Sequence, residues 1–493
     1  MSARVQSLVL LGRDAPLWLA ASVLQAALKP AGVAVTAIEL PSLLHVSDVY
    51  ATLPGIEALH TRLRLDEAGL LRATAGAFSL GQNIRDMLGG HGQFLNAYGA
   101  YGTPIEGNDF FPYWVKARAL GLDVALEQFS PTAAAARQGR VMIPDEASEV
   151  YGRADYGYHL PAIAYAAGLK TVAARLGVAM RTANHIAIER GDGGDIAALV
   201  ADGERVAGEL FVDVTGSDAA LIGKTLGIDQ HSWRAHFPAD RVFAARAQPF
   251  TPIPTYAELR AWPPGWAALY PTQAATHVIH AFSSALTEPE AALAQLGAAT
   301  GLALGDAVLR PSDPGRRDQA WAHNCVAIGS AACALDPIHN LDLHAVQLGL
   351  ITLLTYFPTG QDAAPSRDEY NRLMRSSFER LRDYQAVLYM LAPYPGAFWD
   401  GGRAAPPPPE LAHIVATFRA RGEVPPMEDD SIPTDNWRAL LIGLGIAPES
   451  YPPRIDAAAA DTVKTQFRAM LGFVKDTVQR QPTHAQALGL AHG

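Results

Sequence analysis

Residues 5–39 constrain the fold more than any other stretch of the chain. An apolar run of strand length from Val5 ends at Gly12, an Ala/Leu segment of helical period follows, and a second apolar run from Val33 ends at Glu39. This order predicts a βαβ nucleotide-binding unit. In such a unit, backbone amides at the helix N-terminus bind a pyrophosphate, and the acid that ends the second strand binds a ribose hydroxyl. Gly12 and Glu39 are therefore predicted to contact a dinucleotide.

The first turn of this unit departs from the usual glycine pattern. Glycines are expected at three positions, which in this chain are Gly12, Asp14 and Leu17. The second glycine lets the backbone touch the phosphates, and the third lets helix and strand pack closely. The Asp14 carboxylate adds negative charge there instead, and a partly screened like-charge pair at about 4 Å costs ~1 to 4 kcal/mol. We expect this turn to bind a dinucleotide poorly, or differently, unless a cation or a rearrangement helps.

The composition excludes several classes of protein. The 493 residues are enough for two or three modules, and 49% apolar with 18% charged residues is typical of a globular chain rather than a disordered one. The net charge of −10 and the lack of a long basic run argue against nucleic-acid binding. We therefore expect a globular protein of acidic net charge.

The two cysteines and the N-terminus indicate the compartment. Cys325 and Cys333 are too few for a disulfide scaffold and lack the spacing of metal ligands, which predicts buried free thiols in a reducing environment and no metal site. Only Arg4 precedes the first short apolar run, and no later apolar run is long enough to span a bilayer. We expect neither a signal peptide nor a membrane helix, and the cytoplasm is the expected location.

Glycine turns after apolar strands recur further along the chain. Gly191–Asp195 predicts a hairpin turn, and the apolar run over 209–216 predicts a buried strand that stops at a glycine. Residues 322–329 predict another strand ending at a glycine, before an apolar helix over 345–357. Backbone amides at the N-terminus of this helix could again converge on one ligand. A βαβ start, a meander and a buried strand together indicate a two-domain flavoprotein.

Helices dominate the rest of the chain. The aromatic helix over 110–120 is interpreted as core, and Tyr156 is predicted to open a helix that runs to Leu176. A last amphipathic helix is expected near 457–478, followed by a frayed tail over 484–493.

The order of these landmarks resembles the flavin-dependent tryptophan halogenase family from Val5 to about residue 475. Each matching segment alone is weak evidence, but the order and spacing of the segments together make the fold assignment specific. The matching segments include 8–21, 65–81, 98–107, 195–222, 329–354 and 435–451. The resemblance implies an α/β fold of the FAD-dependent aromatic hydroxylase type, with a Rossmann-type βαβ FAD domain, mixed sheets and a C-terminal helical module. The domains predicted on this basis are an FAD-binding-type domain with inserted substrate-side segments (1–355), a helical substrate or cap module (356–480) and a tail (481–493).

The resemblance also implies a cofactor and its contacts. Family members receive reduced FAD from a separate flavin reductase, activate oxygen with it, and pass hypohalous acid along a tunnel to a lysine beside the aromatic substrate. The positions that the resemblance assigns to cofactor binding are Gly12, Ala15, Glu39, Gly329, Ser330, Asp336, Pro337, Leu341 and Asp342.

The positions of the halogenation chemistry carry other residue types in this chain. The family lysine corresponds to Ser79 in the segment Phe78-Ser79-Leu80-Gly81, and serine can neither form a chloramine nor give a comparable charged hydrogen bond. The helper acid of the family corresponds to His339, and the serine beside it to Asn340. His339 is interpreted either as an acid/base group that titrates near neutrality or as a hydrogen-bonded core histidine.

The halide and flavin contacts are altered as well. The Thr-Gly pair whose amides hold the halide corresponds to Leu341–Asp342, where a carboxylate repels an anion. The Gly-Asp pair at the ribityl chain corresponds to Gly329–Ser330, and the Trp-x-Trp-x-Ile-Pro motif keeps only Trp266 and Pro271. Asp342 either orients substrate or caps a helix that starts at Leu343. We do not expect a competent halogenase.

Three hypotheses remain open. The first is an FAD-dependent monooxygenase that acts on an indole or another aromatic group, free or in a peptide. The second is a pseudoenzyme with a degenerate active site and weak or no FAD binding, which binds a ligand or a partner such as an active paralogue; a homodimer is compatible with either. The third is a halogenase with relocated groups such as Lys116 or Arg85, which nothing in the spacing supports.

Overall fold

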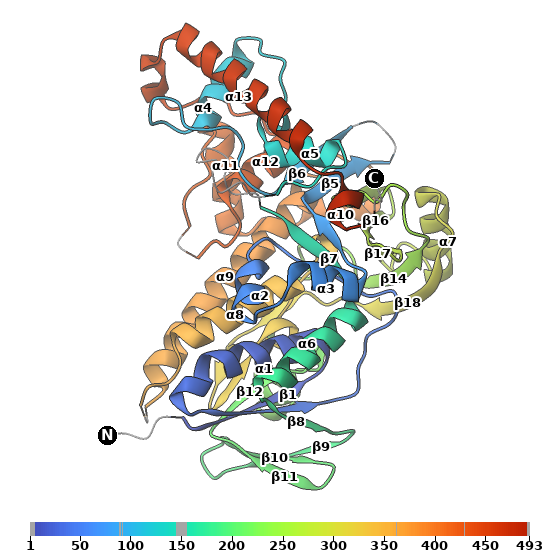
Figure 1. The fold of residues 1–493 in the computed structure, drawn as a ribbon, viewed down its shortest axis with the longest axis vertical. Helices are drawn as coiled ribbons and strands as arrows, with labels where there is room; N and C mark the ends of the chain where they lie inside the picture. The colour runs from blue at the N-terminus through green and yellow to red at the C-terminus, as the bar shows by residue number, and fades with distance from the viewer. Residues whose placement is uncertain are drawn as a thin grey trace. The chain divides into compact units, whose positions relative to one another are not determined.

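The computed structural model describes residues 5–87, 90, 92–143, 155–360, 362–427 and 429–490 (Figure 1). Arg4, on which the prediction about the N-terminal segment rests, lies outside the described residues. The chain forms two compact units that interleave along the sequence. Unit 1 comprises Met1–Gly76, Leu160–Phe237 and Arg310–Arg382, and unit 2 comprises Ala77–His159, Pro238–Leu309 and Asp383–Gly493. The predicted domain boundaries at residues 355 and 480 stay predictions.

Unit 1 is built on a six-stranded sheet in the order β20-β21-β12-β1-β2-β8. All neighbouring pairs are parallel except β20 with β21. Gly12 lies opposite Val214 in one neighbouring strand and opposite Glu39 in the other, so three strand ends meet at one edge. The strands are β1 (Ser7–Gly12), β2 (Ala34–Glu39), β8 (Ala179–Thr182), β12 (Leu210–Val214), β20 (Trp321–Ala322) and β21 (Cys325–Ala327). The predicted βαβ unit is thereby confirmed.

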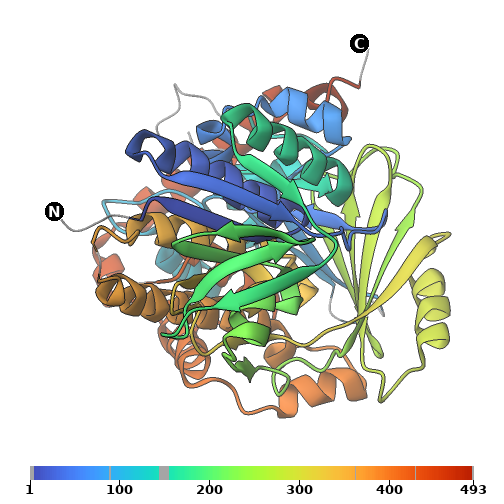
Figure 2. The same cartoon turned by 90° about the horizontal axis from the view of Figure 1, so that it is seen from below.

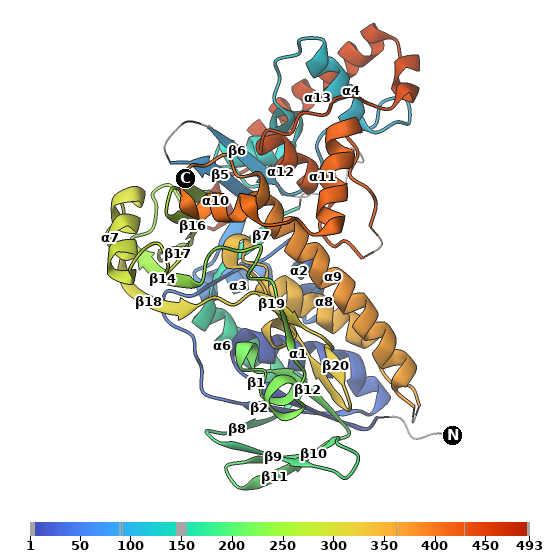
Figure 3. The ribbon, with the colours of Figure 1, turned by 180° about the vertical axis from the view of Figure 1, so that it is seen from behind.

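Apolar helices cover one face of this sheet. Helices α1 (Asp14–Leu28) and α6 (Ala162–Leu176) lie side by side on it (Figure 2), and the small and branched residues of α1 are almost all buried. Helix α8 (Asp342–Thr355) contacts α1 and lies beside the first part of α9 (Ala364–Leu391), as seen from behind in Figure 3. Two shorter helices are α2 (Ile56–Arg62) and α3 (Glu67–Thr74).

A small antiparallel sheet packs on the parallel one through a shared apolar cluster. Its strands are β9 (Ile186–Arg190), β10 (Ile196–Ala201) and β11 (Glu204–Ala207), and the turn between the first two is the predicted hairpin. Leu199 and Val206 pack with Val9 and Phe211 of the parallel sheet. The other short elements of unit 1 are β3 (Val49–Ala51), β13 (Gln230–Ser232), β19 (Gly315–Arg317), β22 (Cys333–Ala334), the 3₁₀ turns at Gly216–Asp218, Gly329–Ala331 and Pro337–His339, and a π-helix at Ala220–Thr225. Cys325 and Cys333 are buried free thiols, as predicted.

Unit 2 contains a seven-stranded mixed sheet in the order β18-β14-β17-β16-β15-β5-β6. β15 pairs with β5 in parallel, which joins residues 81–86 to a meander that follows much later in the chain. Helix α7 (Pro289–Thr300) covers this sheet through Leu296, which packs on Ala267, Leu269 and Val278. The strands are β5 (Gly81–Asp86), β6 (Gln93–Ala97), β14 (Arg241–Ala247), β15 (Ala257–Trp262), β16 (Gly265–Pro271), β17 (Thr276–Phe282) and β18 (Gly305–Pro311).

The helices of unit 2 pack through aromatic side chains. Phe129 lies between Phe110 and Phe467, with ring centroids 4.8 and 5.1 Å away, so the predicted aromatic helix does contribute core residues. The helices are α4 (Phe110–Ala119), α5 (Pro131–Arg137), α10 (Ala397–Ala404), α11 (Pro409–Arg421), α12 (Thr434–Gly443), α13 (Ala460–Arg480) and α14 (His484–Ala487). In the described part of the chain, no helix combines the length and the apolar character that crossing a membrane requires.

Two local predictions are wrong. The segment after Tyr156 forms strand β7 (Gly157–Pro161) before α6 begins, because it pairs antiparallel with β4 (Ala77–Ser79). Residues 484–490 are not a frayed tail: Thr483 caps α14 in a capping box, and the His484 side chain is only 3% exposed. Its imidazole accepts a hydrogen bond from the Phe78 amide at 3.2 Å and bonds the Ile253 carbonyl at 2.9 Å.

Candidate functional site

The first turn of unit 1 brings Gly12 against the neighbouring strand. A Cβ at Gly12 would lie 2.5 Å from the Val214 carbonyl oxygen, so only glycine fits. Helix α1 starts two residues later, and its N-cap residue Arg13 gives no side-chain hydrogen bond to the helix. The Arg13 guanidinium instead pairs with Asp218 at 2.7 Å and donates to the Thr215 carbonyl at 3.1 Å. The amides at this helix end, including that of Ala15, therefore have no side-chain cap and can take an anion.

We expect Gly12→Ala to lower the free energy of unfolding by roughly 1 to 3 kcal/mol, because the added methyl overlaps backbone and forces two strands apart. Urea denaturation measures the change. Gly168→Ala is the matched control, since Gly168 lies inside α6 with no atom within 4 Å of its Cβ position. That variant should gain roughly 0.5 to 1 kcal/mol through helix propensity. Equal effects of the two substitutions would contradict the close approach at Gly12.

Asp14 adopts a backbone conformation that disfavours most side chains. Its φ is +60°, in the left-handed region. The carboxylate accepts hydrogen bonds from the Ser42 hydroxyl at 2.5 Å and the Leu43 amide at 3.4 Å. Burial raises the pKa of Asp14 while these two bonds lower it. Leu17, at the third glycine position, is fully buried. The Asp14 carboxylate therefore lies at the turn, and the hydrogen bonds from the loop after β2 stabilise part of its negative charge.

Glu39 ends β2 as predicted, but partners in its own unit already bind it. Its carboxylate accepts from the Trp18 indole at 3.2 Å and pairs with the Lys170 ammonium at 2.5 Å. Lys170 also lies 5.3 Å from the Trp18 ring centroid, within cation–π range. A ribose hydroxyl at Glu39 would join an existing charge pair, whose side chains are 21% and 41% exposed.

The second glycine turn forms beside the N-terminus of α8. Gly329 has φ +64°, and a Cβ there would lie 2.7 Å from the Val346 side chain. The Ser330 hydroxyl lies 3.5 Å from the Asp342 carboxylate, close to the limit of a hydrogen bond. Burial raises the pKa of Asp342 to about 6, while the Ser330 hydroxyl opposes that rise. Asp342 is the first residue of α8, whose N-cap is Leu341, so the interpretation of Asp342 as a helix cap is wrong.

The segment before α8 is held by local hydrogen bonds. The Asp336 carboxylate caps a short 3₁₀ turn by accepting from the Ile338 amide at 3.0 Å, with Pro337 as the first residue of that turn. Asn340 adopts φ +50° and donates to the Val49 carbonyl at 3.1 Å. Burial lowers the pKa of His339 to about 3, so its imidazole is neutral near pH 7. The His339 side chain is half-buried. Its two interpretations, as an acid/base group and as a core histidine, stay predictions.

Tyr50 belongs to the same neighbourhood, although no pattern in the sequence singles it out. Burial raises its pKa, and the negative charges of Asp14 and Asp342 add to that rise. Tyr50 is the middle residue of β3, the strand that follows β2 in the chain.

Ser79 is the one candidate that belongs to unit 2; the other eleven lie in unit 1. Ser79 ends β4 and is 1% exposed. Its hydroxyl lies 3.4 Å from the Gly81 carbonyl oxygen and hydrogen-bonds the Tyr98 phenol, whose pKa burial raises to about 12. In the remnant of the tryptophan motif, Trp266 is fully buried and donates to the Tyr389 hydroxyl at 2.8 Å.

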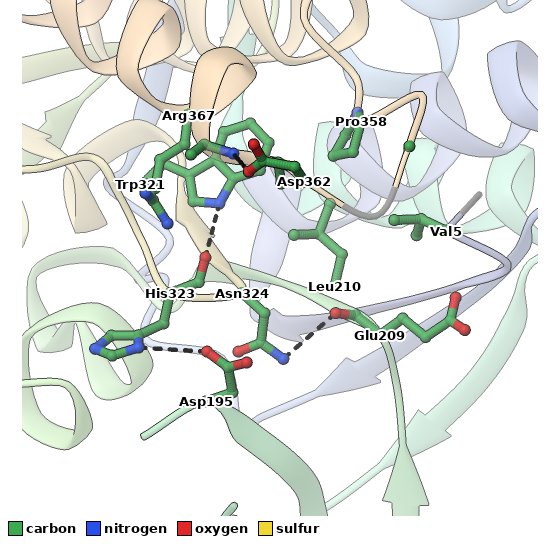
Figure 4. A pocket seen from close by; sticks show the side chains of 13 residues that line it. Val5, Asp195, Glu209, Leu210, Trp321, His323, Asn324, Pro358, Asp362 and Arg367 are labelled. Carbon is green, nitrogen blue, oxygen red and sulfur yellow. Dashed lines mark hydrogen bonds and ion pairs between the residues drawn. The ribbon is translucent and has the colours of Figure 1, made fainter. Parts of the chain in front are cut away.

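A separate pocket of about 490 Å³ opens on unit 1 (Figure 4). Its lining includes Trp321, Arg367 and an ion pair between His323 and Asp195 at 3.3 Å. None of the candidate residues from the sequence lines this pocket.

Comparisons with known proteins agree with this architecture. Residues 7–460 match the family profile described as tryptophan halogenase. BrvH, a flavin-dependent halogenase from Brevundimonas sp. BAL3, superposes with a TM-score of 0.92 at 30% identity over 99% of both chains. Xcc4156, a flavin-dependent halogenase from Xanthomonas campestris, gives 0.92 at 28% identity over 99% of this chain and 98% of its own. The tryptophan 6-halogenase SttH from Streptomyces toxytricini is 24% identical over 68% of this chain and 66% of its own length.

The fold and the paired glycine turns define a flavoprotein of the FAD-dependent aromatic hydroxylase type, as predicted. The chain belongs to the tryptophan halogenase family. Its residues fit FAD at three places: the helix end of α1 that lacks a side-chain cap, the Glu39 carboxylate and the Gly329 turn, which has no room for a Cβ. Asp14 is unfavourable for the phosphates, because it places a carboxylate at the helix end that would bind them.

Proposed function

We propose that this protein is a flavin-dependent oxygenating enzyme that acts on an indole or another aromatic group, free or in a peptide, and does not halogenate. Reduced FAD would come from a separate reductase, as the family implies, and would supply oxygen activation when bound. The observation that carries the proposal is the half-buried carboxyl of Asp342 at the N-terminus of α8, 3.5 Å from the Ser330 hydroxyl. Desolvation raises the pKa of this carboxyl to about 6. Its ionised form repels a halide, and its neutral form can donate a proton.

The residues of unit 1 would divide the work of binding and proton transfer. The amides of Gly12 and Ala15 would hold the pyrophosphate, Glu39 the ribose, and the Gly329–Ser330 turn the flavin side of the cofactor. Asp342 would hold the proton at its carboxyl oxygen, and the Ser330 hydroxyl would orient that oxygen. His339 is neutral and has its pKa lowered to about 3, so it would not act as an acid near pH 7.

A second candidate function rests on a different observation. Asp14 places a carboxylate at the phosphate turn, and Leu17 fills the position of the third glycine. Both features weaken dinucleotide binding. They favour a non-catalytic family member that binds an aromatic ligand or a partner. FAD titration followed by flavin absorbance separates the two candidates: no binding at saturating FAD would refute the enzyme.

The enzyme proposal makes a prediction about pH. We expect turnover of an indole substrate, driven by a reductase, to follow one ionisation near pH 6 and to be lost as Asp342 ionises. Asp342→Asn should remove this inflection and lower kcat roughly 100-fold or more, the usual size of general acid catalysis. Ser330→Ala should move the inflection to higher pH, because the hydroxyl stabilises the ionised carboxyl.

Product mass identifies the reaction, with chloride and bromide present in the assay. Addition of one oxygen atom supports the proposal, and a halogenated product overturns it. A Ser330→Ala profile that coincides with the wild-type profile would remove Asp342 from the proton-transfer role, even if oxygenation is observed.

A further inference from the structure

Unit 2 has a pocket of about 790 Å³ beside α11. Its lining comes from one face of α11, from the proline-containing segment 423–426 and from Arg438 on α12, two helices that lie close together in Figures 1 and 3. Ala416 and Ala420 have small, exposed side chains, so they leave the α11 face of the pocket open. The other lining residues of α11 are His413, Thr417 and Arg421.

The guanidinium of Arg438 is held in one orientation at this pocket. Nη1 of Arg438 donates to the Asp435 carboxylate at 2.9 Å, and Nη2 donates to the Asp109 carboxylate. Cζ of Arg438 lies 4.8 Å from the centroid of the Phe111 ring, which therefore covers one face of the guanidinium. The Arg438 side chain is 13% exposed and lines the pocket. The face that Phe111 does not cover is the one that a ligand in the pocket can contact.

The groups that hold Arg438 are themselves fixed by the fold of unit 2. The Phe111 ring packs against Trp114 and Phe418, with ring centroids 5.7 and 5.8 Å away. The Asp435 carboxylate also accepts a hydrogen bond from the Tyr101 amide at 3.2 Å. A ligand that stacks on the guanidinium therefore does not have to order this side chain first, which lowers the entropic cost of binding.

The charges around the pocket favour a neutral ring over an anion. Arg421 pairs with Glu423 at 2.8 Å, and Arg438 has its two carboxylate partners, so both guanidinium groups already have counter-charges. A planar guanidinium still attracts the negative face of an aromatic ring, and it stacks on such rings better than an ammonium does. The rings of Pro425 and Pro426 add apolar surface to the same pocket.

The length of the lined face indicates the size of the ligand. From His413 to Arg421, α11 rises about 12 Å at ~1.5 Å per residue. An extended chain rises roughly 3.3 Å per residue, so this face accommodates about four residues of an extended peptide. A single aromatic ring would occupy only part of it.

We propose that this pocket binds an aromatic side chain within a short extended peptide. The aromatic ring stacks on the open face of the Arg438 guanidinium, and the peptide backbone runs along α11 past Ala416 and Ala420. Binding of the peptide requires neither FAD nor a reductase. The role of the pocket as a docking site for a peptide substrate rests on the proposed function, in which the aromatic group can belong to a peptide.

Two matched peptides test the class of ligand. Both are blocked pentapeptides of four glycines, one with a central tryptophan and the other with a central leucine. Saturation-transfer difference NMR on the full-length protein without FAD detects weak binding and shows which ligand protons contact the protein. We expect transfer to the indole protons of the tryptophan peptide, and several-fold weaker binding of the leucine peptide, because only the aromatic ring is attracted to the guanidinium. Equal binding of the two peptides would overturn the proposal.

Variants test the place of binding. Ala416→Leu fills the pocket from an exposed position and should abolish binding of the tryptophan peptide. Ala469→Leu is the matched control, since Ala469 is exposed on α13 and does not line the pocket. Arg438→Lys keeps the charge but loses the planar face, so it should weaken binding by about threefold to tenfold.

Urea midpoints show whether each variant folds. Wild-type affinity for the tryptophan peptide in folded Ala416→Leu would overturn the proposal, because the peptide would then bind elsewhere. Ala416→Leu touches none of the ion pairs of Arg438, so it decides the site even if Arg438→Lys does not fold.

Turnover tests the role of the pocket in catalysis. With FAD, a reductase and a peptide that carries two tryptophans, the KM for the peptide should rise several-fold in Ala416→Leu and stay unchanged in Ala469→Leu. Equal KM values in the wild type and Ala416→Leu would refute the docking role. Absence of turnover in the wild type would instead count against the proposed function, and the NMR experiment would still decide whether the pocket binds an aromatic peptide.

Discussion

Replacing Asp14 by glycine is expected to lower the dissociation constant for FAD by about tenfold or more. The carboxylate lies at the helix end that would hold two phosphates, and removing one such repulsion is worth ~1 to 4 kcal/mol, where ~1.4 kcal/mol is a factor of ten. The backbone at position 14 has φ +60°, which glycine adopts without strain. Fluorescence or absorbance titration with FAD measures the change.

Asp14→Asn separates charge from backbone strain. Asparagine tolerates the left-handed region and can still accept the Ser42 hydroxyl, so it removes only the charge. We expect it to recover most of the gain seen with glycine. Asp66→Asn is the control for net charge, because Asp66 caps α3 and asparagine caps a helix equally well. Unchanged FAD affinity in both Asp14 variants would show that this carboxylate does not oppose the phosphates.

Acidification below about pH 6.5 is expected to destabilise the protein by several kcal/mol before pH 5 is reached. Burial lowers the pKa of seven histidines: His159 and His339 to about 3, His60, His280, His344 and His484 to about 4, and His236 in the same direction. The unfolded chain binds protons at these groups from about pH 6.5 downward, while the folded chain does not. Stability is therefore present above pH 6.5 and falls toward pH 4, by at most about 1.4 kcal/mol per histidine and pH unit.

Asp342 opposes this trend. Its pKa is raised to about 6, so its contribution is present at low pH and is lost as pH rises through 6. Burial raises the pKa of Asp14, Asp213 and Asp435 as well, so their contributions have the same sign. We expect these four carboxyls to offset only part of the effect of the seven imidazoles. Urea midpoints at several pH values measure the combined effect of these groups on the free energy of unfolding. His280→Phe keeps the stack with Trp262 and Phe282 and should reduce the slope, whereas Phe282→Leu should lower stability at every pH without changing the slope. A midpoint that stays constant from pH 7 to pH 5 would contradict the prediction.

The chemistry of the first turn was visible in the sequence, but its partners were not. Gly12 and Glu39 follow from local pattern, because a strand, a glycine and an acid at set spacing define a βαβ unit. That Lys170 binds Glu39 and that Ser42 binds Asp14 depends on how α6 and the loop after β2 fold back onto the turn. Lys170 lies more than a hundred residues from Glu39, so no local pattern could pair them.

The properties of His339 and His484 were also decided by packing. A histidine in a sequence suggests titration near neutrality, but desolvation lowers the pKa of His339 to about 3 and that of His484 to about 4. His484 lies near the chain end, where fraying is the usual expectation. Its hydrogen bonds to the Phe78 amide and the Ile253 carbonyl hold the segment in place instead.

The sequence by itself determined the βαβ frame, the family and the residue types at the altered positions, because apolar periodicity and glycine spacing are local properties of a chain. Only the tertiary structure decided which charges are compensated and which imidazoles stay neutral. These properties depend on desolvation and on contacts between residues far apart in the chain, and both arise only when the elements pack.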